Sequence, residues 1–117
     1  MALNTWGVMM KVQLPTPIAK YFAADRGDAN AVAQCFTENG VVVDEHHTYT
    51  GRPAIRQWKE SATTRYKYAS QPIASVEEDG KTVVTSRLTG DFPGSPVDLR
   101  YVFALDGDRI ASLAIMP

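Results

Sequence analysis

Apolar residues recur at helical spacing in two neighbouring stretches of the first third of the chain, residues 16–27 and residues 28–39. Thr16-Pro17 is a typical helix start, with an N-cap residue followed by proline in the first turn. Asp28 is a second N-cap, and Gly27 and Asn39-Gly40 are typical helix stops. The sequence therefore predicts a hairpin of two short helices, whose apolar positions are Ile18, Tyr21 and Phe22 in the first and Val32, Cys35 and Phe36 in the second.

A short β-branched run follows, and a longer helical pattern comes after it. Residues 41–45 predict a strand, and residues 48–50 are expected to pair with it across a His46-His47 turn. Gly51-Arg52-Pro53 then opens a helix. The apolar face of this helix, at spacings of three and four, indicates one long amphipathic helix in mid-chain and consists of Ile55, Trp58, Ala62 and Tyr66.

From residue 66 to the C-terminus the hydrophobic period changes to two, which is typical of strands that bury one face. Asp79-Gly80 is a two-residue hairpin signal, residues 92–96 predict a rigid corner, and residues 106–108 predict a last turn. Helices first and antiparallel strands afterwards predict one α+β domain over residues 15–117, with three helices packed on a curved antiparallel sheet. Residues 1–14 show no periodic pattern, and we expect them to form an N-terminal arm.

Composition and charge narrow the classes of partner. The 117 residues carry a formal net charge of -1, with Lys and Arg scattered singly, which argues against a nucleic-acid surface or a polybasic membrane face. No apolar run approaches the roughly 20 residues of a membrane span, and the first residues lack a secretory signal pattern. Cys35 is the only cysteine, so no internal disulfide can form. We expect a soluble, cytoplasmic protein.

Four segments, in this order, resemble the nuclear transport factor 2-like superfamily over residues 15–117, in particular its SnoaL-like branch of polyketide cyclases and small uncharacterised proteins. They are Tyr21-Phe22-Ala23-Ala24-Asp25-Arg26-Gly27-Asp28, Phe36-Thr37-Glu38-Asn39-Gly40-Val41-Val42-Val43-Asp44, Gly51-Arg52-Pro53-Ala54-Ile55 and Gly90-Asp91-Phe92-Pro93-Gly94-Ser95-Pro96. The resemblance implies a cone-shaped α+β barrel, whose sheet wraps around the long helix and leaves a mostly apolar cavity at the wide end. It also implies a homodimer through the outer sheet face. Because members include isomerases, dehydratases, cyclases and proteins that only bind, the fold alone does not fix the function.

Asp44, at the end of the first strand, is the leading candidate for chemistry. By the resemblance, it matches the position at which ketosteroid isomerase keeps its general base. A partly desolvated carboxylate can act as a base near neutral pH, because desolvation raises its pKa. Alternatively, Asp44 or Glu45 pairs with Arg52, Arg56 or a histidine as a structural ion pair. Both interpretations stay open at this point.

Two tyrosines and a histidine are candidates to act with Asp44. By the resemblance, Tyr21 matches the isomerase tyrosine that donates a hydrogen bond to the developing oxyanion; otherwise it is a packing residue. Tyr101 falls where the isomerase uses a protonated carboxylic acid, a departure that argues against steroid-type isomerisation. His46 is a candidate acid or base oriented by Asp44, whereas a solvated His46-His47 pair is the simpler interpretation.

The sequence thus predicts a cavity that binds a small hydrophobic or aromatic molecule and needs no cofactor or metal, since no paired Cys, spaced His pair or glycine-rich phosphate loop is present. The candidate catalytic residues are Asp44, Tyr21, Tyr101 and His46, and the candidate pocket-lining residues are Trp58, Phe22, Phe103, Tyr66 and His47. Three hypotheses stay open. The protein is a cofactor-free isomerase, dehydratase or cyclase with Asp44 as general base, a non-catalytic ligand-binding module, or a dimeric interaction domain whose cavity its own side chains fill.

Overall fold

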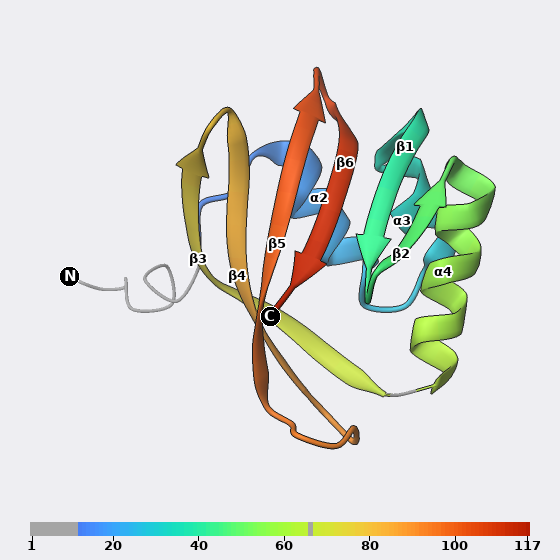
Figure 1. The fold of residues 1–117 in the computed structure, drawn as a ribbon, viewed down its shortest axis with the longest axis vertical. Helices are drawn as coiled ribbons and strands as arrows, with labels where there is room; N and C mark the ends of the chain where they lie inside the picture. The colour runs from blue at the N-terminus through green and yellow to red at the C-terminus, as the bar shows by residue number, and fades with distance from the viewer. Residues whose placement is uncertain (1–11, 66) are drawn as a thin grey trace.

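The computed structural model describes residues 12–65 and 67–117; most of the expected N-terminal arm, and Tyr66, lie outside these residues. The helices are α2 (Thr16–Ala24), α3 (Ala29–Gln34) and α4 (Arg52–Arg65), and the strands are β1 (Phe36–Asp44), β2 (His47–Thr50), β3 (Tyr68–Glu78), β4 (Lys81–Gly90), β5 (Val97–Asp106) and β6 (Arg109–Met116). The strands form one sheet in the order β2-β1-β6-β5-β4-β3 (Figure 1). The α+β class, with helices first, is confirmed. No helix of the described residues is long and apolar enough to cross a membrane.

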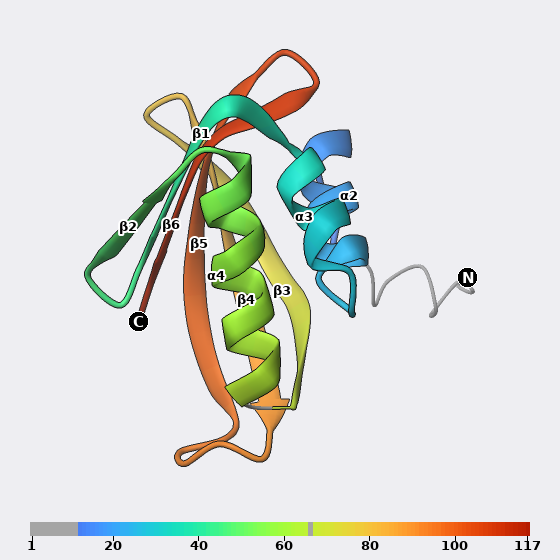
Figure 2. The same cartoon turned by 90° about the vertical axis from the view of Figure 1, so that its right-hand side faces the viewer.

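The helices lie together on one side of the sheet, as Figure 2 shows. Helix α4 contacts α3 and the β1–β2 pair, and α2 contacts β3 and β6. The apolar faces predicted from helical spacing meet the sheet there, and each fully buried aliphatic or aromatic side chain stabilises the fold by roughly 1.5–3 kcal/mol. The large aliphatic and aromatic side chains with almost no exposed surface are Ile18, Tyr21, Val32, Phe36, Val42, Ile55, Val84, Phe103, Ile110 and Leu113.

One strand pair departs from the expected antiparallel sheet. Strands β1 and β6 run parallel, with Val42 opposite Leu113 and Asp44 opposite Ile115, so the sheet is mixed. The other four neighbouring pairs are antiparallel, as expected. The turn signals in the sequence report only pairs of strands that follow each other along the chain. The β1–β6 pair joins distant segments, so no local signal could predict its direction.

Strand β1 also begins earlier than its β-branched run predicts. Phe36 was expected on the second helix, but α3 ends at Gln34, and Phe36 already pairs with Ile110 of β6. The register between β1 and β6 shifts before Val41, which marks an irregularity in the strand. A Cβ added at Gly40 would lie 2.8 Å from the Cβ of Phe36. Gly40 therefore permits this close approach within the strand and is not a helix stop.

Candidate functional site

A cavity of about 930 Å³ lies between α4, the ends of β1 and β2, and β3 to β6. It is open to solvent on one side, where the exposed residues Glu45 and His46 lie. A cavity of this size accommodates a drug-sized ligand. The apolar part of the wall includes Leu88, Phe92, Pro93, Val97, Leu99 and Ile115, and the polar or amphipathic part includes Tyr21, Asp44, Tyr49, Trp58, Lys59, Tyr68 and Tyr101.

Asp44 reaches the cavity because of its place on β1. Successive strand side chains alternate between faces, so Asp44 shares a face with Val42, which is fully buried. The strand ends at Asp44, and a two-residue turn of Glu45 and His46 brings His47 opposite it. Both turn residues have positive φ, 50° and 66°, as a type I′ turn requires. The half-buried carboxylate therefore lies between a dry core and an exposed turn.

Trp58 of α4 holds this carboxylate. Its indole Nε1–H donates a hydrogen bond of 3.0 Å to Oδ2 of Asp44, and the Trp58 side chain is only 6% exposed. The two arginines considered as ion-pair partners have other contacts: Arg52 donates to the carbonyl oxygen of Phe36, and Arg56 forms an exposed ion pair with Glu60. An indole is a neutral donor, so this contact orients the carboxylate without neutralising it.

Tyr21 and Tyr101 reach the same cavity from α2 and β5, with their ring centroids 6.3 Å apart. Burial raises the pKa of Tyr101 to about 12; the nearby Ser70 hydroxyl opposes this shift, and the Asp44 charge adds to it. Burial also holds the pKa of Tyr21 well above its ordinary value, with smaller contributions from Tyr101, Tyr68 and Asp44. Both phenols therefore keep their protons at neutral pH and can donate hydrogen bonds to a ligand oxygen.

The other predicted residues are distributed between the core and the surface. Phe22 and Phe103 do not line the cavity; they pack against Tyr21 in the aromatic core, with centroids 5.1 and 5.5 Å from its ring. Phe103 lies on the same face of β5 as Tyr101, but it is fully buried and does not line the cavity. His46 lines the mouth, whereas His47 is exposed and lies beside Tyr49, 6.5 Å away between ring centroids. Sequence patterns predict which face of a strand a side chain lies on, but not how deeply the side chain is buried below the cavity.

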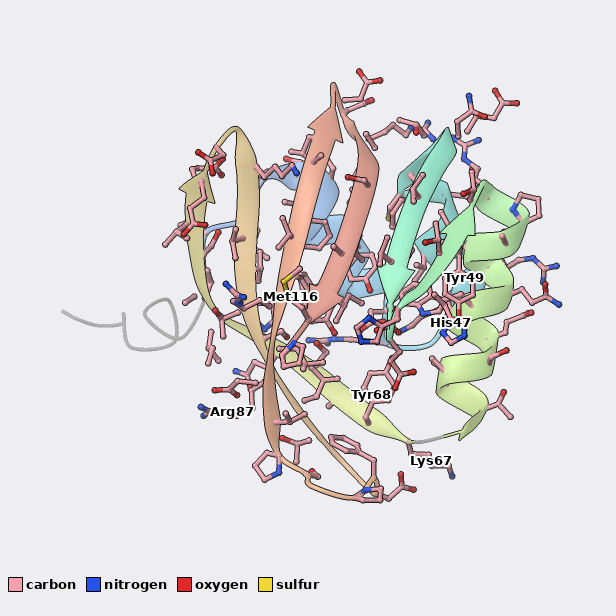
Figure 3. The ribbon with its side chains drawn as sticks, viewed as in Figure 1. His47, Tyr49, Lys67, Tyr68, Arg87 and Met116 are labelled. Carbon is pink, nitrogen blue, oxygen red and sulfur yellow. The ribbon has the colours of Figure 1, made fainter. Side chains whose placement is uncertain are left out.

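The sequence analysis did not predict three further polar residues at or behind the cavity wall, Lys59, Asp25 and Tyr68. Lys59 of α4 is 2% exposed, forms an ion pair with the buried Asp25 at the end of α2, and donates a hydrogen bond of 2.5 Å to the hydroxyl of Tyr68. Tyr68 lies at the start of β3, below the labelled β2 residues His47 and Tyr49 (Figure 3). A signal was present in the sequence. Asp25 and Lys59 each follow a core residue by four positions on a helix, where a charge is unexpected.

No grouping of three His, Cys, Asp or Glu side chains suited to a metal ion occurs within residues 12–65 and 67–117. The described residues of this site offer the half-buried carboxylate of Asp44, the amine of Lys59, several phenols and an apolar wall, with Glu45 and His46 at the mouth.

Residues 18–113 match the SnoaL-like domain family. The chain belongs to this family. Its resemblance to the SnoaL-like branch of the nuclear transport factor 2-like superfamily is thereby confirmed. No curated protein matches the sequence.

Solved structures of SnoaL-like and related proteins share the fold. A protein from Sinorhizobium meliloti, described as a candidate polyketide cyclase, is 36% identical with a TM-score of 0.83, over 88% of this chain and 95% of that one. A Catenulispora acidiphila protein with a ketosteroid isomerase-like fold, solved with trimethylamine, is 20% identical with a TM-score of 0.78, over 90% and 87% of the two chains. A candidate isomerase of the SnoaL-like family from Agrobacterium tumefaciens is 22% identical with a TM-score of 0.70, over 86% and 92%.

Proposed function

We propose that this protein binds a small, largely apolar carbonyl compound in the cavity and transfers a proton from the carbon next to the carbonyl group, with Asp44 as general base. The observation that carries the proposal is the arrangement around Asp44. Its carboxylate is held by Trp58 and lines the same cavity as two phenols that are neutral at physiological pH, Tyr21 and Tyr101. One base and neutral oxyanion donors are the parts that cofactor-free enolisation needs.

The chemistry follows from these groups. The Asp44 carboxylate takes a proton from the carbon, and the electrons of that C–H bond move toward the carbonyl oxygen to give an enolate. A phenol stabilises the enolate oxygen by a hydrogen bond, and Tyr101 and Tyr21 are the candidates because both line the cavity and hold their protons. The protonated Asp44 then returns the proton to another carbon, which is isomerisation. If the enolate carbon attacks a second carbonyl, the proton goes to the new alkoxide, which is aldol cyclisation.

The similarity to solved structures favours aldol cyclisation over isomerisation. Two of the relatives are described by a reaction, the candidate polyketide cyclase from Sinorhizobium meliloti and the candidate isomerase from Agrobacterium tumefaciens. The candidate cyclase is the more similar of the two to this chain. Cyclisation of a polyketide-like chain also suits an open cavity with an apolar wall, because the reacting carbons must fold against each other away from water.

Exchange of carbon-bound hydrogen in heavy water tests the proposal without knowledge of the substrate. The probe is 2-tetralone, a bicyclic ketone of suitable size, and proton NMR follows the loss of its signal next to the carbonyl group. We expect the protein to accelerate exchange and Asp44→Asn to reduce the acceleration about 100-fold or more, since positioned bases contribute 10²–10⁴-fold. Asn keeps the oxygen that accepts from Trp58. The control is Asp98→Asn, at an exposed carboxylate paired with Arg87. Equal rates for Asp44→Asn and the unchanged protein would refute a catalytic Asp44.

A ligand-binding module without catalysis is the second candidate, with a small ammonium ion as the ligand. Trp58 and Tyr49 have ring centroids 6.2 Å apart beside Asp44, and aromatic faces with a carboxylate suit an ammonium ion. The fold neighbour from Catenulispora acidiphila was solved with trimethylamine. Calorimetric titration with trimethylammonium chloride tests this function. Binding that Asp44→Ala abolishes would favour it, and absence of heat would reject it.

We also propose that the protein pairs with itself through the outer face of the sheet. Strand register places one apolar row across five strands on the face opposite the helices: Val76, Val83, Val102, Ala114 and Val43. Val83 is buried, and Ala114 and Val43 also border the cavity. Val76 is 52% and Val43 37% exposed. Light scattering during gel filtration should give twice the chain mass of 12.9 kDa, and Val102→Glu should reduce it to one chain. A monomeric unchanged protein would exclude this pairing.

A further inference from the structure

Lys59 is a buried amine at the cavity wall that the proposed proton transfer does not use. It lies one residue after Trp58 on α4, lines the same cavity, and has 2% of its surface exposed. Its ammonium group lies 5.0 Å from the ring centroid of Tyr68 and 5.6 Å from that of Trp58. The charge is therefore enclosed by aromatic groups, and its contacts with neighbouring oxygen atoms determine what the amine can do.

A carboxylate and a phenol both contact the Lys59 amine. Asp25 forms an ion pair with Nζ and is itself only 8% exposed. A carboxylate in contact with an ammonium group at a dry site can accept its proton, and both charges then disappear together. Burial lowers the pKa of Lys59 to about 8, so the neutral amine is accessible near physiological pH. A neutral lysine amine is a nucleophile.

Tyr68 supplies an acid at the same atom. An ammonium group has donors and no acceptor, so in the 2.5 Å bond between Nζ and the Tyr68 hydroxyl the phenol oxygen accepts. The phenol hydrogen is then left to donate elsewhere, and Tyr68 lines the cavity. Burial raises the pKa of Tyr68, so it holds its proton at neutral pH. Nucleophile, base and acid thus meet at one point of the wall, the combination that covalent catalysis by an amine requires.

We propose that Lys59 is a carbonyl-capturing amine, which condenses with an aldehyde or ketone in the cavity to form an imine. Asp25 takes one proton from the ammonium group, and the freed lone pair forms the C–N bond while the carbonyl oxygen takes the Tyr68 proton. The nitrogen returns a proton to the Tyr68 oxygen. The hydroxyl of the carbinolamine then takes the Tyr68 proton again and leaves as water while the nitrogen lone pair forms the C=N bond. The iminium nitrogen returns its remaining proton to the Tyr68 oxygen, which leaves a neutral imine and a neutral phenol. The sum is amine plus carbonyl compound giving imine plus water. This inference rests on the proposed function in one respect, that carbonyl compounds enter the cavity.

Reductive trapping tests the proposal on the intact protein. Benzaldehyde is the probe, and sodium cyanoborohydride supplies the hydride that reduces an imine to a stable benzylamine. Peptide mass spectrometry at pH 7.5 then compares Lys59 with the exposed residues Lys20, Lys67 and Lys81. Burial lowers the pKa of Lys59, so a larger fraction of this amine is neutral at this pH than of an ordinary exposed lysine. We expect Lys59 to be labelled at least about tenfold faster than the three exposed lysines.

Three variants serve as controls for the labelling experiment. Lys59→Arg keeps the ion pair with Asp25 and should lose label at this position only. Tyr68→Phe keeps the ring and removes the acid, and it should slow labelling of Lys59 about tenfold while leaving the exposed lysines unchanged. Asp44→Asn should leave the labelling of Lys59 intact, even though it reduces the acceleration of 2-tetralone exchange about 100-fold or more, so the two proposals fail separately. Labelling of Lys59 in the unchanged protein at or below the rate of the exposed lysines would overturn the inference, and Lys59 would then be a structural ion.

Discussion

Trp58 on α4 donates its indole hydrogen to Oδ2 of Asp44, at the end of β1, over 3.0 Å. The contact joins the middle of the long helix to the strand end at the cavity wall. It connects two features that the sequence suggested separately, an apolar helix face and a carboxylate after a strand. The indole orients the carboxylate that the proposed reaction uses as a base.

Replacement of Trp58 by Phe tests this orienting role. The change keeps most of the apolar contact and removes the donor, so Asp44 loses one of the contacts that orient it. We expect the exchange of 2-tetralone to slow about tenfold and the free energy of unfolding to fall by about 1 kcal/mol, the usual net contribution of one hydrogen bond. Exchange kinetics and urea denaturation measure the two effects. An unchanged exchange rate in a folded Trp58→Phe variant would show that Asp44 needs no partner on α4.

The turn after Asp44 is built from residues that do not favour it. Glu45 and His46 both adopt positive φ, where Asn and Gly are preferred and other residues are strained by roughly 1–2 kcal/mol each. The double substitution Glu45→Asn and His46→Gly should therefore raise the free energy of unfolding by about 1–2 kcal/mol. Glu45→Gln alone removes the charge but keeps the strain, and it should have little effect. Urea denaturation midpoints compare the variants, and a double variant no more stable than the unchanged protein would contradict this account.

The order of elements was predictable because it depends on local patterns, whereas the direction of the Asp44 side chain stayed open. Helical spacing places Ile55 and Trp58 toward the core. The ion pair between Asp25 and Lys59 could not be predicted from the sequence, because it depends on how α2 and α4 pack against each other, and no local pattern records that packing. The same limit applies to the parallel β1–β6 register and to the depth at which Phe103 lies.

Gly90 controls where Tyr68 lies, because the two residues are opposite each other at the start of the β3–β4 ladder. A Cβ at Gly90 would overlap the carbonyl oxygen of Lys67 and lie 2.8 Å from the Cα of Tyr68. Gly90→Ala should therefore move backbone and lower the free energy of unfolding by about 1–3 kcal/mol, as other overpacked sites do. It should also slow benzaldehyde labelling of Lys59.

Gly27→Ala is the matched control, since a Cβ there meets nothing within 4 Å. It should leave stability unchanged or raise it by up to about 1 kcal/mol, because alanine reduces the freedom of the unfolded chain. Equal free energies of unfolding for the alanine variants at positions 27 and 90 would contradict this prediction, because they would mean that the β3 backbone at Tyr68 can move without cost.

Alkaline pH should destabilise the protein through its buried phenols. Burial raises the pKa of Tyr101 from 10.0 to about 12, so between these values the folded state holds a proton that the unfolded state has lost. The stability from this group is fully present below pH 10 and is lost as the pH rises toward 12. Urea denaturation from pH 9 to pH 12 should show this loss, and Tyr101→Phe should make it smaller. An identical pH dependence in Tyr101→Phe would contradict the assignment.

A crystal structure with 2-naphthol bound tests the central claim most directly. This planar phenol carries its oxygen where the enolate of 2-tetralone would carry it, and such analogues bind more tightly than substrates. The account predicts that naphthol occupies the cavity, with its oxygen within hydrogen-bond distance of a tyrosine hydroxyl and a ring carbon facing the Asp44 carboxylate. Naphthol bound elsewhere, or held in the cavity with Asp44 directed away from the ring, would contradict a reaction centred on Asp44.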